Sequence, residues 1–299
     1  MDNATDQSMP EENHPQQEMQ YSNEIFMPGE EVILQDSKNR RYLITLVPGK
    51  TFHSHSGAVE HDFVIGKKNA SYIKARYAES GIDRERYYLA IKPTLADVIL
   101  KMPRGAQVIY PKDLGAILMA ADVYPGARIL ESGIGSGALS MTLLRAGAIV
   151  KGYEIRQDFI ELACENIEKH RKQIFGYDSG NNSDIAARFS VECRDVYQGI
   201  DETDLDRILL DLPEPWQVVP FAQKALKAGG IFLAYLPTIN QTTALRECLR
   251  ENKFILSETL EVLNRTWHIE GNSVRPDHRM VAHTGFITVA RNNAGDSAT

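Results

Sequence analysis

The sequence has little cysteine, has no long apolar run, and begins with a stretch that lacks basic residues. Cys164, Cys193 and Cys248 lie far apart. Without a Cys-x-x-Cys pair, neither a disulfide framework nor a structural zinc site is indicated. No apolar run approaches the roughly 20 residues of a membrane-spanning helix. These absences favour a cytoplasmic globular protein, for which we expect no metal and no membrane partner.

The charge is unevenly distributed along the chain. Residues 1–24 contain six acidic residues and neither Lys nor Arg, so they account for most of the net charge of −7. This acidic stretch, rich in Gln, Asn and Pro, predicts a disordered tail, and residues 292–299 predict a second tail. The rest of the chain is nearly neutral. Composition therefore does not exclude a nucleic acid, because local basic patches can bind phosphates.

Two sequence patterns follow one another between these tails. In residues 25–77, turn residues separate five short strand-like runs, EVILQD, RRYLITLV, TFHSH, HDFVIG and SYIKARY, which predicts a small β-barrel-like domain. Residues 78–92 are expected to be a connector. From residue 93 to 291, strand-like and helix-like segments alternate, with one long helix expected over residues 156–174, another from about 217 to 228, and a Gly/Ser/Asn loop over 176–184. This alternation predicts a mostly parallel sheet with helices on both faces.

A glycine-rich loop follows the first strand of the α/β part, in the segment ILESGIGSGALS. Gly133, Gly135 and Gly137 would let the backbone approach a ligand closely, and the helix that follows adds free N–H donors. Glu154 ends the next strand, where an acid binds ribose hydroxyls in dinucleotide folds. Taken alone, these features fit a nicotinamide-dependent dehydrogenase as well as a methyltransferase.

Acids at further strand ends favour the methyltransferase. Glu131 would repel a pyrophosphate but suits a cation, such as an amino group or a sulfonium. Asp195 ends the third strand and, with Val196, could flank an adenine ring. These acids could instead only cap the following loops. Their convergence at the carboxyl ends of strands, where open α/β sheets bind ligands, favours S-adenosylmethionine (SAM), which carries no phosphate.

Asp211 ends the fourth strand, in the segment DRILLDLPEPWQ, on a turn that Pro213 and Pro215 make stiff. Its carboxylate could accept a hydrogen bond from an exocyclic amine and so orient the neighbouring ring nitrogen toward a methyl donor. Adenine offers this pair, because N6 donates and N1 attacks. Asp211 could also only cap the next helix, and Trp216 could either stack on a base or pack in the core.

Five segments together resemble the tRNA (adenine-58)-N1 methyltransferase family: VIYPKDLGAI, LESGIGSGALS, YEIR, LDLPEPW and RPDHRMVAHTGFITVAR. The resemblance extends over residues 28–291. It implies a class I SAM-dependent methyltransferase, Rossmann-like, with a mostly parallel seven-stranded sheet and a small N-terminal β domain. It also implies methylation of N1 of adenosine 58 in the T-loop of tRNA, with S-adenosylhomocysteine as product. Prokaryotic members are homotetramers, so we expect a homotetramer.

The resemblance also assigns residues. Asp211 would orient the target base and contact the cofactor. The remaining cofactor contacts would be Gln107, Glu131, Gly133, Ile134, Gly135, Ser136, Gly137, Glu154, Ile155, Phe159, Asp195 and Val196. Contacts to the RNA would come from Tyr110, Trp216, Arg265, Arg275, His278 and Arg279, although the basic residues could form salt bridges within the chain.

Two other functions remain open on the same fold. A non-catalytic RNA-binding subunit would be expected to lose the glycine loop or the acids, and this chain keeps both. A methyltransferase of protein or small-molecule substrates would keep them.

Overall fold

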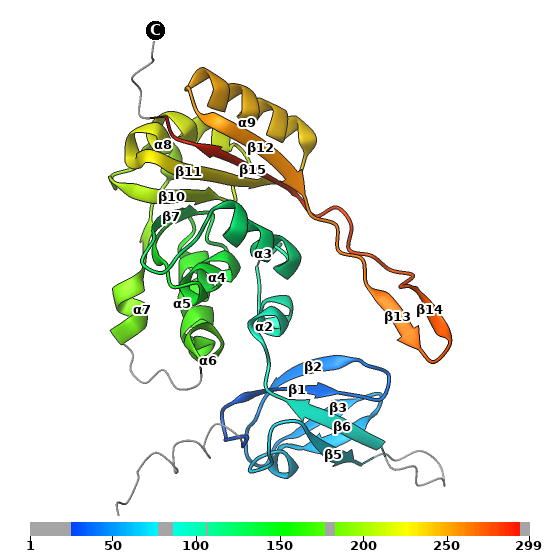
Figure 1. The fold of residues 1–299 in the computed structure, drawn as a ribbon. Helices are drawn as coiled ribbons and strands as arrows, with labels where there is room; N and C mark the ends of the chain where they lie inside the picture. The colour runs from blue at the N-terminus through cyan, green and yellow to red at the C-terminus, as the bar shows by residue number, and fades with distance from the viewer. Residues whose placement is uncertain (1–24, 77–85, 106, 177–182, 294–299) are drawn as a thin grey trace, which may run out of the picture. The chain divides into compact units, whose positions relative to one another are not determined.

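The computed structural model describes residues 25–76, 86–105, 107–176 and 183–293 (Figure 1). The chain divides into two units, Met1–Pro93 and Thr94–Thr299. The predicted tail 1–24 lies outside the described residues, as do 294–299 of the predicted C-terminal tail and 177–182 of the expected Gly/Ser/Asn loop.

The N-terminal unit is built from antiparallel strands. These are β1 (Glu31–Gln35), β2 (Arg41–Thr45), β3 (Thr51–Ser54), β4 (Gly57–Glu60), β5 (Ser71–Ala75) and β6 (Arg86–Ile91). They form a four-stranded sheet, in the order β2-β1-β6-β5, and a β3–β4 hairpin. Because side chains alternate between the two faces of a strand, Val32 and Leu34 of β1 and Tyr88 of β6 all reach the core. The predicted small β domain is confirmed.

Two local predictions for this unit are wrong. The segment HDFVIG, expected to be a strand, begins with the 3-10 helix η1 (His61–Phe63). Here the Val47 N–H donates to His61 Nδ1 at 3.0 Å and the Gly49 N–H donates to the Asp62 carboxylate at 3.1 Å, so side chains of η1 bond to the turn before β3. Residues 86–91, part of the expected connector, form β6, which pairs with both β1 and β5.

The second unit contains the seven-stranded sheet that the sequence predicts. Its strands are β7 (Arg128–Ser132), β8 (Ile149–Glu154), β9 (Phe189–Cys193), β10 (Leu205–Leu210), β11 (Leu226–Leu236), β12 (Ile255–Glu261) and β15 (Phe286–Arg291). The order is β12-β15-β11-β10-β7-β8-β9, and only β15 runs antiparallel to its neighbours. The chain moves outward from β7 to β9 and then returns to β10 beside β7. The carboxyl ends of β7 and β10 therefore flank the topological switch point, where such sheets bind ligands.

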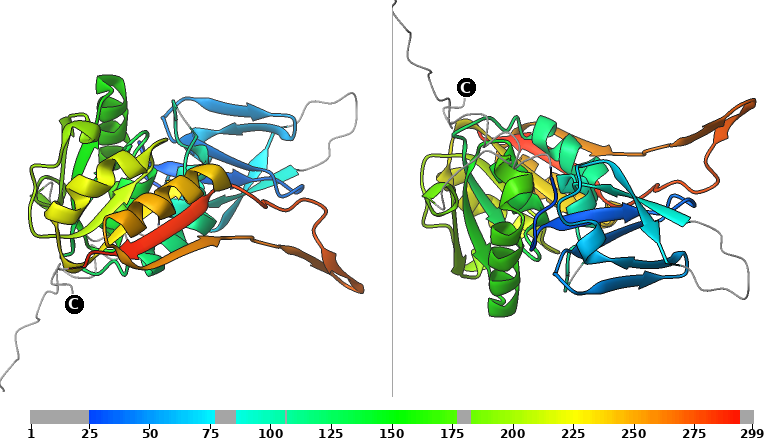
Figure 2. Two further views of the ribbon diagram at one scale, coloured as in Figure 1. Left: turned by 90° about the horizontal axis from the view of Figure 1, so that it is seen from above. Right: turned by 90° about the horizontal axis from the view of Figure 1, so that it is seen from below.

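Helices cover both faces of this sheet (Figures 1 and 2). They are α2 (Leu95–Lys101), α3 (Pro111–Ala120), α4 (Ala138–Arg145), α5 (Gln157–Lys169), α6 (Arg171–Phe175), α7 (Ser183–Arg188), α8 (Val219–Ala225) and α9 (Ile239–Glu251), with short 3-10 helices η2 (Val196–Gln198) and η3 (Pro215–Val218). One apolar core lies under α2 to α6, and a second lies under η3, α8 and α9. This layered architecture confirms the predicted fold class.

Some boundaries differ from the prediction. The long helix expected over residues 156–174 divides at His170 into α5 and α6. The helix expected from about 217 to 228 ends at Ala225, and Leu226 already begins β11. Asn292, placed in the predicted tail, is buried, and its amide donates to the Leu226 carbonyl at 3.0 Å.

A hairpin that the sequence did not predict extends away from the sheet (Figure 2). Its strands are β13 (Trp267–Glu270) and β14 (Ser273–Pro276). Trp267 faces Pro276 and Ile269 faces Val274, so one side of this two-stranded ribbon is apolar. Trp267 and Ile269 are 56% and 73% exposed, so the described part of the chain leaves that side uncovered.

Candidate active site

The glycine loop between β7 and α4 is held directly against Asp211. Gly133 has a φ of +86°, and a Cβ on it would lie 2.2 Å from the Asp211 carbonyl oxygen. Only glycine fits there, because the position combines a left-handed backbone with a backbone contact. The Asp211 N–H donates to the Ser132 carbonyl at 3.0 Å. The loop and the end of β10 therefore form one continuous surface.

A cavity of about 370 Å³ opens over this surface. Nine residues assigned to cofactor binding line it: Gln107, Gly133, Gly135, Glu154, Ile155, Phe159, Asp195, Val196 and Asp211. Five further lining residues were missed: Ser132, Tyr153, Arg156, Tyr197 and Leu212. Each missed residue lies one or two positions from a predicted one, so proximity to a strand end would have identified them.

Four residues of the predicted cofactor set do not line this cavity. Glu131 is fully buried beneath the loop, and Ile134 packs against Gly152 of β8. The Ser136 carbonyl accepts a hydrogen bond from Asn166 at 3.0 Å. Gly137, at a φ of +84°, precedes α4 as its N-cap. These four residues shape the loop from behind.

Glu154 and Asp195 have partners of their own at the cavity wall. Glu154 Oε2 accepts from the Gly135 N–H at 3.3 Å, and its Oε1 accepts from the Arg156 N–H at 3.0 Å. Asp195 caps η2 by accepting from the Tyr197 N–H at 2.9 Å. Capping, the alternative role considered for such acids, is thus real for Asp195. Both acids still line the cavity, and a carboxylate can accept further hydrogen bonds.

Phe159 and Arg156 form the outer wall of the same cavity. The Arg156 guanidinium lies 3.7 Å from the centroid of the Phe159 ring, a cation–π contact. The ring also abuts Gly105, where a Cβ would lie 2.7 Å from Phe159 Cε1. The ring is therefore fixed between two neighbours.

Two acids at this end of the sheet, Glu131 and Asp211, have raised pKa values and no ion pair with a described Lys or Arg. Burial raises the pKa of Glu131 to about 8, although Ser140 donates a hydrogen bond to its Oε2 at 2.8 Å. Glu131 Oε1 has no hydrogen-bond partner among the described residues. Burial also raises the pKa of Asp211 to about 7. A cationic ligand would lower both values, because it stabilises the ionised carboxylates. The acids therefore fit a sulfonium or an ammonium group.

A second cavity, of about 540 Å³, adjoins the first. Gln107 and Asp211 line both cavities. The remaining walls come from Val108, Ile109, Tyr110, Tyr235, Pro237, Met280, Val281, Ala282, His283 and Thr284. Among the residues assigned to RNA contacts, only Tyr110 lies here. Tyr235, His283 and Thr284 were assigned no role from the sequence, although His283 and Thr284 lie within the segment RPDHRMVAHTGFITVAR; they come from β11 and from the segment before β15, remote from the glycine loop.

His283 closes one side of the second cavity. Its Nδ1 lies 2.7 Å from a Glu261 carboxylate oxygen and its Nε2 lies 2.9 Å from the Pro237 carbonyl oxygen. Both partners only accept hydrogen bonds, which favours the doubly protonated ring. The Pro237 carbonyl and the Glu261 carboxylate accordingly raise the pKa of His283.

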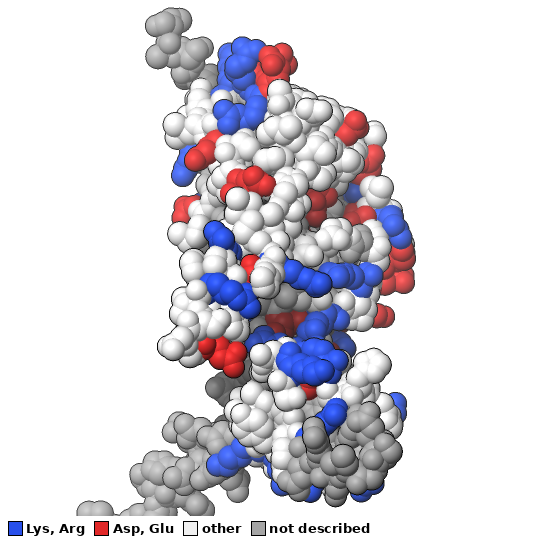
Figure 3. All heavy atoms as spheres, turned by 90° about the vertical axis from the view of Figure 1, so that its right-hand side faces the viewer, with Lys and Arg blue, Asp and Glu red and all other residues white. Residues whose placement is uncertain are grey.

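The other predicted RNA contacts lie outside both cavities. Trp216 is half-buried and packs against the core under α8 and α9, which favours the packing alternative for this residue. Arg265, Arg275, His278 and Arg279 are exposed around the β13–β14 hairpin. Figure 3 faces the side toward which this hairpin extends, and many Lys and Arg side chains are visible on it. No carboxylate of a described residue forms an ion pair with these four.

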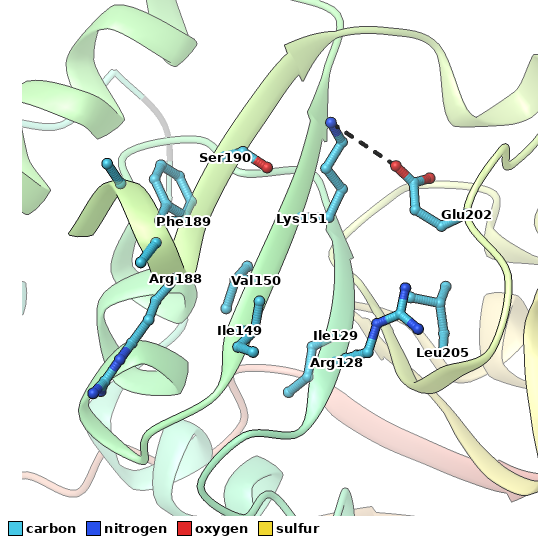
Figure 4. Close-up of a pocket in the computed structure, with 12 residues that line it drawn as sticks. Arg128, Ile129, Ile149, Val150, Lys151, Arg188, Phe189, Ser190, Glu202 and Leu205 are labelled. Carbon is cyan, nitrogen blue, oxygen red and sulfur yellow. Dashed lines mark ion pairs between the residues drawn. The ribbon is translucent and has the colours of Figure 1, made fainter. Parts of the chain in front are cut away.

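A third cavity, of about 230 Å³, lies at the opposite end of the sheet (Figure 4). It is lined by the starts of β7, β8 and β9 and by the end of α7, including Arg128 and Arg188. Lys151 at its edge pairs with Glu202 at 3.9 Å, and the Arg188 guanidinium stacks on Phe175 at 5.7 Å. In Figure 4 the Arg128 and Arg188 side chains point in different directions, so they do not form a common anion site.

The described residues contain neither a cluster of metal-ligating side chains nor a membrane-spanning helix. Among the described residues, no three His, Cys, Asp or Glu side chains come together as a metal site would require. None of the helices in the described ranges is both long and apolar enough to cross a bilayer.

The fold and the acid-lined cavity define a class I SAM-dependent methyltransferase. Residues 86–275 match the family model described as "tRNA methyltransferase complex GCD14 subunit", and residues 25–73 match the model "TrmI-like N-terminal". The chain belongs to this tRNA methyltransferase family, which confirms the family predicted from the sequence.

Named relatives agree with this assignment. The chain is 39% identical over 222 residues to the tRNA (adenine(57)-N(1)/adenine(58)-N(1))-methyltransferase TrmI of Methanocaldococcus jannaschii, covering 69% of this chain and 78% of the relative. It is 31% identical over 270 residues to the tRNA (adenine(58)-N(1))-methyltransferase TrmI of Thermus thermophilus, covering 87% and 96%.

Solved structures show the same fold. The tRNA (m1A58) methyltransferase TrmI of Aquifex aeolicus superposes with a TM-score of 0.75 at 27% identity, covering 91% of this chain and all (100%) of that one. A structure described as a SAM-dependent O-methyltransferase of Thermotoga maritima superposes with a TM-score of 0.81 at 32% identity, covering 92% and 97%.

Proposed function

We propose that this protein transfers a methyl group from SAM to N1 of adenosine 58 in the T-loop of tRNA. Family membership and the activities named for the relatives support this reaction. At the level of the site, the observation that carries it is the position of Asp211, which lines both cavities. One carboxylate can thus face a methyl donor on one side and a methyl acceptor on the other.

We assign the first cavity to the cofactor. The backbone of the glycine loop would face the methionine part, Glu154 would accept hydrogen bonds from the ribose hydroxyls, and Asp195 with Val196 would flank the adenine. Bound SAM supplies an electrophilic methyl group on a positively charged sulfur. Glu131 and Asp211 match that charge, because burial without a positive partner raises the pKa of both.

We assign the second cavity to the target adenine. Asp211 would accept a hydrogen bond from N6 and so hold N1 in line with the methyl group. Bound SAM would supply the methyl group to N1, with the electrons of the broken carbon–sulfur bond left on sulfur. Asp211 would then stabilise the positive charge that passes to the base. No proton transfer is required.

The base must leave its stack to enter this cavity, which costs a few kcal/mol. We propose that Arg265, Arg275, His278 and Arg279 contact the tRNA phosphates and help to offset that cost. We further propose a cytoplasmic homotetramer, in which the exposed apolar side of the β13–β14 hairpin is covered by another subunit. The expected separation into a β domain, residues 25–77, and a catalytic domain, 93–291, stays a prediction.

Mass spectrometry of nucleosides tests the proposed function. Bulk tRNA, a protein mixture and a metabolite pool would each be incubated with the protein and methyl-labelled SAM. We expect labelled 1-methyladenosine in the tRNA alone. Label in protein or metabolites instead would support the other methyltransferase alternative, and cofactor binding without any transfer would support the non-catalytic subunit.

A further inference from the structure

A buried polar network lies beneath the second cavity and uses residues that no step above requires. Lys112, near the start of α3, donates from Nζ to Asp113 Oδ1 at 2.8 Å, to the Val262 carbonyl at 2.6 Å and to Thr284 Oγ1 at 2.6 Å. An ammonium group has three protons. Every donor of Lys112 is therefore used inside the protein.

The network continues through the second oxygen of Asp113. Oδ2 accepts from the Thr284 hydroxyl at 2.6 Å and from the Tyr235 phenol at 3.3 Å. The Asp113 side chain is fully buried, and that of Lys112 is 7% exposed. A buried ion pair contributes little net stability. When all its groups are satisfied, however, such a network fixes one arrangement of the segments that it joins.

The segments that this network joins form walls of the second cavity, which we assign to the target adenine. Tyr235 and Thr284 line it, and Tyr110, the N-cap of α3, lines it as well. Lys112 and Asp113 do not line it. The Tyr235 ring is also packed on the backbone beside Thr284, because a Cβ on Gly285 would lie 2.4 Å from Tyr235 Cζ. Tyr235 therefore cannot shift without moving the segment that carries Thr284.

We propose that Lys112 and Asp113 are positioning residues for methyl transfer. By fixing Tyr235 and Thr284 beside Asp211, they set the shape in which the adenine must lie for N1 to meet the methyl group. This inference rests on the proposed function of the same site. It predicts an effect on the rate of the bound complex, because phosphate contacts dominate tRNA affinity and the cofactor cavity contains none of these residues.

The test compares Asp113→Asn with a matched variant, Asp206→Asn. Asp206 is likewise a buried acid, pairs with Lys227 at 2.7 Å and accepts from the Arg128 N–H at 2.8 Å, but it lies at the opposite end of the sheet. In Asp113→Asn we expect kcat for tRNA to fall between about tenfold and a hundredfold, as for a misplaced substrate. The Kd of SAM, measured by calorimetry, and the KM for tRNA should change less than about twofold. Asp206→Asn should lose thermal stability and keep its kcat.

Thr284→Val provides a second, milder variant that preserves side-chain volume and removes the central hydroxyl. It should lower kcat in the same way, and the double variant with Asp113→Asn should be no slower than the slower single variant, because both changes break one network. Unchanged kcat in both single variants, or an equal loss in Asp206→Asn, would overturn the inference. The wild-type protein is assayed first: if it does not methylate tRNA, the proposed function fails and takes this inference with it, whereas an active wild type with unaffected variants removes the inference alone.

Discussion

The acidic residues at the two ends of the seven-stranded sheet differ in whether a Lys or Arg pairs with them. At the amino ends of the strands, Asp206 pairs with Lys227 at 2.7 Å and Asp122 pairs with Arg207 at 3.0 Å. At the carboxyl ends, no Lys or Arg of the described residues forms an ion pair with Glu131, Glu154 or Asp211.

The pKa values follow this difference. Burial acts to raise the pKa of Asp206, but hydrogen bonds from Lys227, from the Arg128 N–H and from Tyr124 outweigh it, so the net shift is downward. Burial of Glu131 and Asp211 raises their pKa values to about 8 and about 7, with no cation to oppose it. Acids that the protein does not neutralise itself mark the end of the sheet where a positively charged ligand supplies the missing partner.

We expect the largest effect from alanine substitutions of two glycines that have the same backbone conformation before and after β7. Gly133 and Gly126 share a φ of +86°, but a Cβ on Gly126, before β7, meets nothing within 4 Å, whereas one on Gly133 meets Asp211. Both alanine variants should lose about 1 kcal/mol to backbone strain. Only Gly133→Ala should also abolish measurable SAM binding by calorimetry. Equal cofactor affinity in the two variants would contradict the close approach of loop and strand.

The next comparison is between Asp211→Asn and Asp206→Asn, whose aspartates lie at opposite ends of β10. Asparagine keeps the size of the side chain but cannot balance the positive charge that develops on the base. We expect the kcat of Asp211→Asn to fall by about a hundredfold or more, with tRNA binding preserved. Asp206→Asn should remain active. Quantification of 1-methyladenosine in single-turnover reactions measures both, and a fully active Asp211→Asn would remove this residue from the mechanism.

The smallest expected effect is a change in the free energy of unfolding, and its sign is opposite for acids at the two ends of the sheet. The raised pKa of Glu131 means that the unfolded chain loses its proton more readily. The contribution of Glu131 to the stability of the fold is therefore fully present below about pH 4.5 and is lost as the pH rises through about 8. Glu131→Gln should therefore raise the free energy of unfolding at pH 8 by about 1–3 kcal/mol, and by less at pH 5.

Asp206 has a lowered pKa, so its contribution is present above its ordinary value and lost as the pH falls. Asp206→Asn should accordingly lower the free energy of unfolding at pH 7. Denaturant titrations of both variants at pH 5, 7 and 8 measure these differences. The same sign of change in both variants would refute the contrast between the two ends.

The first cavity was largely predictable because its parts are local in sequence. Gly133, Glu154, Asp195 and Asp211 each follow a strand, and the carboxyl ends of parallel strands meet at one edge. The full burial of Glu131 was not predictable, because it depends on how α4 places Ser140 over the strand end.

The second cavity could not be predicted in the same way. Tyr235 and Thr284 come together because β15 pairs antiparallel with β11, a long-range contact with no local signal. The β13–β14 hairpin was missed for a similar reason, since Trp267 and Ile269 belong to no core that would give the segment a recognisable pattern. Trp216 shows the converse, because an aromatic residue beside a site can still belong to the core.

The claim that Asp211 is buried without a cationic partner, whereas Asp206 has one, is tested most directly by titrating both carboxyl groups by carbon-13 NMR. The variants Asp211→Asn and Asp206→Asn assign the signals. We predict that Asp211 titrates near pH 7 in the free protein and at a clearly lower pH once SAM is bound. Asp206 should titrate below 3.8 in both states. An Asp211 that titrates near 3.8 in the free protein, or that does not respond to the cofactor, would refute its assignment as a buried acid that the bound cofactor neutralises.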